Sequence, residues 1–154
     1  MSFEKRREIA SFIMRVFVSL VLIYSGYLKI IEPREQFIDS ILSYKIVGEK
    51  IALIVASFLP WFELYLGIVL LAGIFVKITS AVAFFLFIFF ELILLQAMIR
   101  GLEIANCGCF GASHSNPIQL EFMLNLIWIV FAYLSFKYSY RFSLDFVIEK
   151  RFGR

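Results

Sequence analysis

The only two cysteines of the chain stand one residue apart in the sequence Asn-Cys107-Gly108-Cys109-Phe-Gly, and the single histidine, His114, follows closely. Two thiols in such a motif can form a structural disulfide, bind a metal or act as a redox centre. A disulfide across one residue closes a very small loop, so it removes little entropy from the unfolded chain and stabilises poorly. Such a constrained ring exchanges readily with other thiols, and Gly108 supplies the backbone freedom to close it. The spacing therefore favours redox chemistry.

Two other interpretations of this motif stay open. Cys107, Cys109 and His114 offer three ligands for zinc or a softer ion, with Glu121 or an acid from another segment as a fourth. The spacing matches no standard zinc motif, so we assign no metal ligand. The two thiols are otherwise small hydrophobic side chains of an apolar loop. In the redox interpretation, His114 and the start of the next helix would stabilise a thiolate on one sulfur.

Ionisable side chains also interrupt apolar runs that are long enough to cross a membrane. Glu63 and Glu91 each lie inside such a run. A charge in hydrocarbon costs at least about 2.5 kcal/mol on insertion scales, so both carboxyls should face the protein interior. Both are expected roughly 10 Å below the same membrane surface, beneath the cysteine motif. We therefore predict catalytic residues Cys107, Cys109, Glu63 and Glu91, and cofactor-binding residues Tyr24, Lys29, Gln96 and Asn125.

Structural roles compete with this site. Glu63 could form a purely structural salt bridge with Lys29. Tyr24 suits an interfacial anchor as well as a ligand contact. Arg15 lies near the other end of its run and is expected to reach the interface with its guanidinium, so it is left out of the site. The glycines Gly26, Gly67 and Gly73 are expected to be close helix-packing points.

Membrane-spanning helices must position these residues. The chain has 154 residues, of which 62% are hydrophobic and 19 are phenylalanine, whereas an ordinary globular domain is only about half apolar. Apolar runs of about the length that crosses a bilayer are expected at 9–31, 51–76, 78–99 and 118–136. The predicted fold is all-α: one membrane domain over 1–154, a four-helix bundle with a short external Cys-Gly-Cys loop.

Local patterns add detail to these helices. The stretch 32–50 is too polar to span and should be an external loop or an interfacial helix. Asn116 as N-cap, Pro117 at the first helical position and Gln119 two residues later predict the start of the fourth span. Helical spacing gives the first and fourth spans one polar face each, and both should point inward. These faces comprise Arg15, Ser19, Leu22, Gly26 and Lys29 on the first span, and Glu121, Asn125, Trp128, Ala132 and Ser135 on the fourth.

The distribution of basic residues predicts the orientation. Nine lysines and arginines fall in the N-terminus, the loop between spans two and three, and the C-terminal tail, against five on the opposite side. Both termini should therefore be cytoplasmic in a cell inner or cytoplasmic membrane. The cysteine loop would face an external, oxidising compartment. A net charge of only +3 without a basic stripe gives no support for nucleic-acid binding.

Several motifs together resemble a known group of membrane proteins. Arg15 followed by Tyr24-Ser-Gly-x-x-Lys29, then Pro60-Trp-x-Glu63-Leu-x-x-Gly67, and then Cys-Gly-Cys-Phe-Gly are similar to the DoxX-like superfamily. The cysteine motif resembles its methylamine-utilisation MauE branch. The resemblance implies a four-helix membrane bundle that forms or handles disulfides of exported proteins, with a thioredoxin-like partner. For DoxX-like relatives it also implies quinone-coupled sulfur oxidation.

One departure from related systems matters for mechanism. Membrane disulfide-forming enzymes of the DsbB and vitamin K epoxide reductase types use two cysteine pairs, whereas this chain has one. Electrons must then pass directly from Cys107 and Cys109 to a partner or a bound quinone. The leading interpretation is a membrane thiol–disulfide oxidoreductase that works between an exported thioredoxin-fold protein and a quinone. The alternatives are a soft-metal binding or transport protein and a non-catalytic membrane anchor; membrane lipid is an expected partner in every case.

Overall fold

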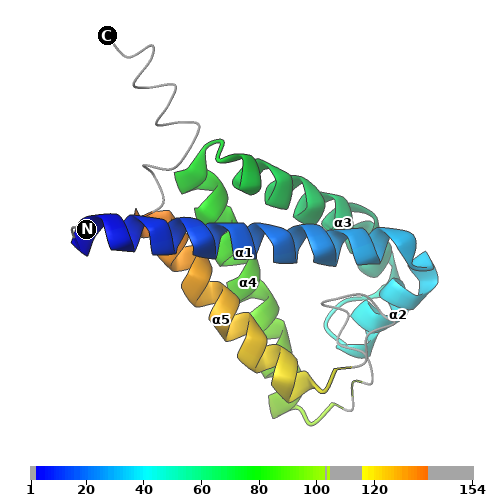
Figure 1. The fold of residues 1–154 in the computed structure, drawn as a ribbon. Helices are drawn as coiled ribbons and strands as arrows, with labels where there is room; N and C mark the ends of the chain where they lie inside the picture. The colour runs from blue at the N-terminus through cyan, green and yellow to red at the C-terminus, as the bar shows by residue number, and fades with distance from the viewer. Residues whose placement is uncertain (1–2, 103, 105–115, 139–154) are drawn as a thin grey trace.

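The computed structural model describes residues 3–102, 104 and 116–138, and within these ranges the chain is helical with no β-strand. The described residues form five helices, whose arrangement can be followed in Figure 1. They are α1 (Phe3–Ile31), α2 (Arg34–Ser43), α3 (Glu49–Ala72), α4 (Val76–Ile99) and α5 (Ile118–Tyr138). All but α2 are long and apolar enough to cross a membrane. The all-α class and the four predicted spans are confirmed.

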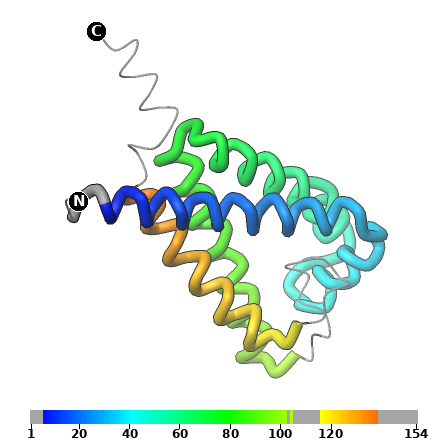
Figure 2. Tube along the Cα trace, in the orientation of Figure 1, coloured from blue at the N-terminus to red at the C-terminus, as the bar shows by residue number. Residues whose placement is uncertain are grey.

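The long helices associate in two pairs. α1 packs along α3, α4 packs along α5, and the pairs are joined mainly by contacts between α1 and α5. Figures 1 and 2 show the pairs meeting near the N-terminal end of α1 and diverging toward the end where α2 lies. The short helix α2 packs against α3 and α1. The polar stretch 32–50, predicted to be either a loop or an interfacial helix, therefore contains a helix.

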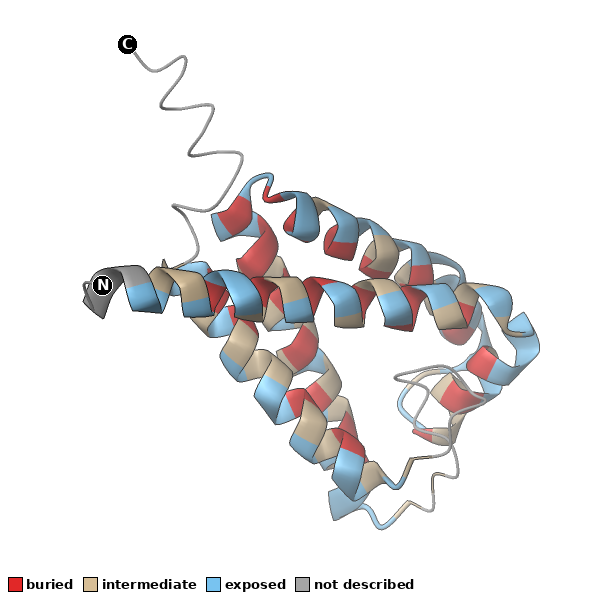
Figure 3. Cartoon of the chain, in the orientation of Figure 1, coloured by how far each residue is buried: buried red, intermediate tan, exposed pale blue. Residues whose placement is uncertain are grey.

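Burial follows the predicted faces (Figure 3). All five residues of the α1 face are buried, as are four of the five on α5; the fifth, Trp128, is partly buried. The opposite sides expose large apolar residues, such as Phe17 on α1 and Met123 on α5, which a membrane would cover. Arg15 is 2% exposed, so the prediction that its guanidinium reaches the surface is wrong. It lies over the ring of Phe12 at 5.0 Å.

Two glycines bring α1 and α3 into backbone contact. A Cβ atom on Gly26 would lie 2.7 Å from the carbonyl oxygen of Pro60 and 2.8 Å from the nitrogen of Leu64. A Cβ on Gly67 would lie 2.9 Å from the carbonyl oxygen of Ser19. All three distances are too short for any side chain without movement of the helices. The predicted packing role of Gly26 and Gly67 is confirmed, and this contact sets how closely polar side chains of the two helices meet.

The boundary between the second and third spans differs from its prediction. Gly73 has a φ of 76° and ends α3, and the N–H of Ile74 donates to the carbonyl of Val69 across the turn. The helix α4 then begins at Val76, so Val76 and Lys77 belong to the third span rather than to the second and the loop. Gly73 thus ends the helix, and its predicted packing role stays a prediction. Hydropathy alone missed the turn because the residues around it are apolar.

α5 begins at Ile118, where the fourth span was predicted to begin, but the residues that cap it differ from the prediction. The carbonyl of Pro117 accepts from the N–H groups of Leu120 and Glu121, so Pro117 occupies the capping position. Asn116 does not cap through its side chain; its Nδ2 donates to Oε1 of Glu121 at 2.7 Å. This contact holds a buried carboxylate at the first turn of α5.

Candidate functional site

A buried ion pair joins α1 to α3. Lys29 Nζ lies 2.7 Å from both carboxylate oxygens of Glu63 and 2.9 Å from Ser25 Oγ. Ser25 Oγ in turn donates to Glu63 Oε2 at 3.0 Å. The side chains of Lys29 and Glu63 are 1% and 0% exposed. Three acceptors match the three N–H bonds of an ammonium, so the lysine is saturated by this set.

The sequence explains why these groups meet. Ser25 and Lys29 are four residues apart and therefore lie on one face of α1. Gly26, between them, allows α3 to approach at Pro60, one turn before Glu63. In a medium of low dielectric constant the pair can stay ionised only while both partners remain in place. The predicted alternative of a salt bridge between Glu63 and Lys29 is thus what the structure contains, whether or not the pair also takes part in chemistry.

A second polar connection joins α4 to α5. Asn125 Nδ2 donates to Glu91 Oε2 at 2.7 Å and to the carbonyl oxygen of Phe87 at 2.9 Å. The other carboxyl oxygen of Glu91 is buried and has no hydrogen-bond partner among the residues that the structure describes. Glu91 and Asn125, both predicted site residues, therefore lie in direct contact.

A small cavity of about 20 Å³ lies where the four spanning helices meet. Its polar wall comprises Ser25, Glu63, Glu121, Asn125 and Trp128, and its apolar wall includes Phe87 and Phe90. Asn125 thus links the two polar connections, because it contacts Glu91 and also shares this cavity with Glu63. The sequence prediction that Glu63 and Glu91 serve one site depends on this indirect link; among the described residues no hydrogen bond joins the two carboxyls.

A larger cavity of about 180 Å³ lies between α2, α3 and α4. Its wall is formed by aromatic and aliphatic side chains, among them Phe37, Leu59, Phe90 and Leu94, and Lys29 is the charged residue among the described residues that line it. Lys29 Nζ lies 5.5 Å from the ring centres of Phe37 and Phe90. The ion pair therefore separates the two cavities: Lys29 faces the apolar one, and Glu63 faces the polar one.

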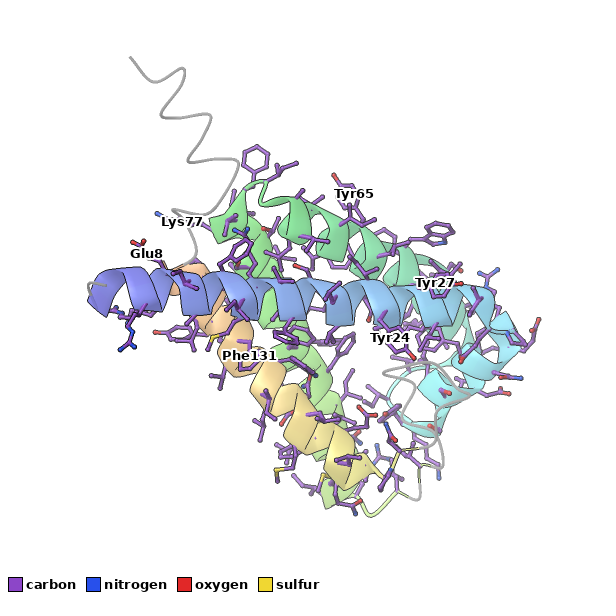
Figure 4. All side chains as sticks on the ribbon, viewed as in Figure 1. Glu8, Tyr24, Tyr27, Tyr65, Lys77 and Phe131 are labelled. Atoms are coloured by element: carbon purple, nitrogen blue, oxygen red, sulfur yellow. The ribbon has the colours of Figure 1, made fainter. Side chains whose placement is uncertain are left out.

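The other predicted site residues stand apart from these cavities. Tyr24 is 48% exposed on α1 and lines neither cavity; Figure 4 labels its position. Gln96 is partly buried on α4 and also lines neither cavity. Its amide oxygen is buried and has no hydrogen-bond partner among the described residues. Cys107, Cys109 and His114 lie outside the described residues.

Sequence reasoning did not assign Ser25, Trp128 or Phe37 to a site. The spacing of Ser25 and Trp128 carried a usable signal, since each shares a helix face with an assigned residue, Lys29 and Asn125 respectively. Nothing in the sequence indicated that Phe37, on the short helix α2, covers Lys29. A helix face shows which residues point inward, but the tilt of the neighbouring helix decides what they meet.

The segment carrying the cysteines joins helix ends that pack next to the apolar cavity. Tyr44 and Leu94, which line that cavity, belong to a buried cluster against which the partly buried residues Leu102, Ile104 and Ile118 pack. These three residues flank the cysteine segment on its two sides. The described ends of that segment are therefore anchored beside the larger cavity.

Comparison with known proteins gave one family. Residues 7–137 match the model of the family described as methylamine utilisation protein MauE. No curated protein and no solved structure matched the chain.

Proposed function

Because the chain belongs to the MauE family of membrane proteins, with a match over residues 7–137, we propose that it is a membrane thiol–disulfide oxidoreductase. In this proposal Cys107 and Cys109 cycle between dithiol and disulfide and exchange electrons with an exported thioredoxin-fold protein. The observation that carries the proposal is the packing of the helix ends that flank the cysteine segment against an apolar cavity with a buried ion pair in its wall. A disulfide handler in a membrane needs such a place for an apolar electron carrier.

The electron balance is simple. Exchange with the partner transfers two electrons and two protons, so that one dithiol becomes a disulfide while the other disulfide becomes a dithiol. With a single cysteine pair, the same two sulfurs must then pass the electrons to, or take them from, a second redox group. A quinone in the membrane meets this need because it exchanges two electrons and two protons when bound.

The larger cavity fits the ring of a quinone. Its volume of about 180 Å³ exceeds the roughly 150 Å³ of an engineered apolar cavity that binds benzene. Phe37 and Phe90 would hold a ring by stacking or edge contacts, and an isoprenoid tail could extend into lipid. In this proposal Lys29, which lines the cavity, and its partner Glu63 hold or move protons at the ring.

The helix that begins at Ile118 gives the two sulfurs different roles. The N-terminal end of a helix favours negative charge. Cys109 is nearer to it in the sequence, so we assign Cys109 as the stabilised leaving thiolate and Cys107 as the sulfur that carries the mixed disulfide.

Trapping of the mixed disulfide tests the proposal. Purified Cys109→Ser protein, incubated with oxidised thioredoxin as a thioredoxin-fold probe, should give a reductant-sensitive band of the combined mass. The Cys107→Ser variant should give much less of it, and the double variant none. If neither single variant forms the band while the wild-type protein binds one soft metal ion per chain, the oxidoreductase proposal is wrong and a metal-binding function replaces it.

A further inference from the structure

The small cavity between the four spanning helices is polar on one side and lined by side chains of all four. Glu63 reaches it from α3, Ser25 from α1, and Glu121, Asn125 and Trp128 from α5. Glu63 and Glu121 are 0% and 3% exposed. Two buried carboxyl groups thus line one small cavity, although no hydrogen bond between them is present among the described residues.

The size and the wall of this cavity suit a single water molecule. A cavity needs about 10–15 Å³ of accessible space to hold one water, which should find two to four polar partners there. The volume of about 20 Å³ meets the first condition, and the five polar side chains of the wall meet the second. An independent observation points the same way: Trp128 Nε1 is a buried donor without a partner among the described residues. Buried donors are rarely left unpaired, so this N–H calls for an acceptor.

The cavity also stands between two structures that matter for redox chemistry. Glu121 lies in the first turn of α5, next to the segment that carries the cysteines, and Asn116 holds its carboxyl group. On the other side Glu63 binds Lys29, which lines the larger apolar cavity. A water molecule between Glu121 and Glu63 would complete a chain of exchangeable protons from the start of α5 to that cavity.

We infer that the small cavity is a water site and that Glu121, this water, and the pair of Glu63 and Lys29 form a proton path between the cysteine segment and the apolar cavity. The path rests on the proposed function, in which protons are released at one redox group and taken up at the other. Oxidation of the dithiol releases two electrons and two protons, and the quinone that takes up the electrons takes up two protons. Asn116 positions the carboxyl group of Glu121, and Trp128 donates to the water.

The water can be detected without any assay of activity. The chain has two tryptophans, so protein labelled with ¹⁵N at the indole nitrogen should give two indole signals in detergent micelles. Trp61→Phe and Trp128→Phe assign them, and Trp61, which is 60% exposed on α3, is the matched comparison. The Trp128 indole proton should show a cross-peak to a long-lived water. Absence of this cross-peak, with a resolved Trp128 signal, would overturn the water site.

The path is tested by Glu121→Gln. The new amide oxygen can still accept from Asn116, so the fold should be retained while the exchangeable carboxyl proton is lost. Reduction of a short-chain ubiquinone by the pre-reduced protein should slow at least about tenfold, given the usual size of acid–base contributions, and the wild-type rate should fall in D₂O more than that of the variant. Gln119→Ala, on the exposed side of the same turn, should match wild type.

These outcomes separate the path from the proposed function. If Glu121→Gln reduces the quinone at the wild-type rate with an unchanged solvent isotope effect, the path is wrong, while mixed-disulfide trapping can still support the oxidoreductase. Failure of trapping through both cysteines, in contrast, removes the function and leaves the water cross-peak as evidence for the site alone. In the expected result, disulfide exchange of the Gln119→Ala protein with thioredoxin stays at the wild-type rate.

Discussion

Burying the ion pair between Lys29 and Glu63 in a membrane helix bundle costs desolvation free energy. Both charges are removed from water, and the attraction between them offsets a desolvation cost of several kcal/mol for each ion. Packing alone would be served as well by two apolar side chains of similar volume. A purely structural role and a role in chemistry can therefore be distinguished by comparing the two single variants with the double variant. If the role is structural, an apolar pair should preserve quinone reduction; if the pair takes part in chemistry, it should not.

We predict that Lys29→Met and Glu63→Leu each lower the free energy of unfolding by about 3–5 kcal/mol, because each leaves one buried charge without its partner. The double variant should recover most of this loss, yet exchange no electrons with quinone. Denaturation in mixed micelles measures the stabilities, and a double-mutant cycle gives the coupling. A double variant with wild-type quinone reduction would show that the pair is structural only.

Glu91 is expected to contribute differently, since it is bound by an amide rather than by a cation. In a Glu91→Gln variant the amide oxygen can still accept from Asn125, so the free energy of unfolding should change by less than about 1 kcal/mol. Turnover with thioredoxin and ubiquinone should nevertheless slow about tenfold or more if this carboxyl handles protons. Equal turnover of the variant and the wild type would remove Glu91 from the site.

At the level of helices, the site depends on the close approach of α1 and α3. Lys29 and Glu63 can bind each other and each form a hydrogen bond with Ser25, because Gly26 lets the backbones of the two helices approach closely. Any side chain at position 26 would meet the backbone of Pro60 and Leu64, which cannot move independently of α3.

Gly26→Ala should therefore separate the two helices and weaken the ion pair. We expect a loss of about 1–3 kcal/mol of stability from overpacking, together with slower quinone reduction. The matched control is Gly48→Ala before α3, where an added Cβ meets no atom within 4 Å and φ is −83°. Thermal unfolding of both variants in the same detergent decides the point; equal midpoints would contradict a backbone contact at Gly26.

The sequence predicted the helices better than it predicted their contacts. Apolar length revealed the four spans, and periodicity revealed which face of α1 and α5 is buried, because both follow from local chemistry. The turn at Gly73 was missed since apolar residues continue through it, and Phe75 adopts a φ of 48° that no propensity suggests. Tyr24 was grouped with Lys29 by depth, but its rotation around α1 directs it outward. The depth of a residue in the membrane follows from its position along the helix. Whether it belongs to a site also depends on its direction around the helix and on the angle at which the neighbouring helix packs.

For the whole molecule, the described helix ends fall into two groups. The N-terminal part of α1, the turn between α3 and α4 and the C-terminal end of α5 lie toward one end, and α2 lies toward the other (Figures 1 and 2). Lys77 and Lys137 belong to the first group, and Arg34 and Lys45 to the second. These four residues therefore lie at the ends to which the nine-to-five count of basic residues assigned them.

Because cytoplasmic loops carry the excess of lysine and arginine, we predict that the end with Lys77 faces the cytoplasm and that Cys107 and Cys109 face outward. After mild reduction of intact cells, a membrane-impermeant maleimide should label the wild-type cysteines. In a background with both cysteines changed to serine, Lys45→Cys should also be labelled in intact cells, whereas Lys77→Cys should react only after lysis. The opposite pattern at these two positions would reverse the orientation. It would also place the cysteine pair in a reducing compartment, where an exported partner could not reach it.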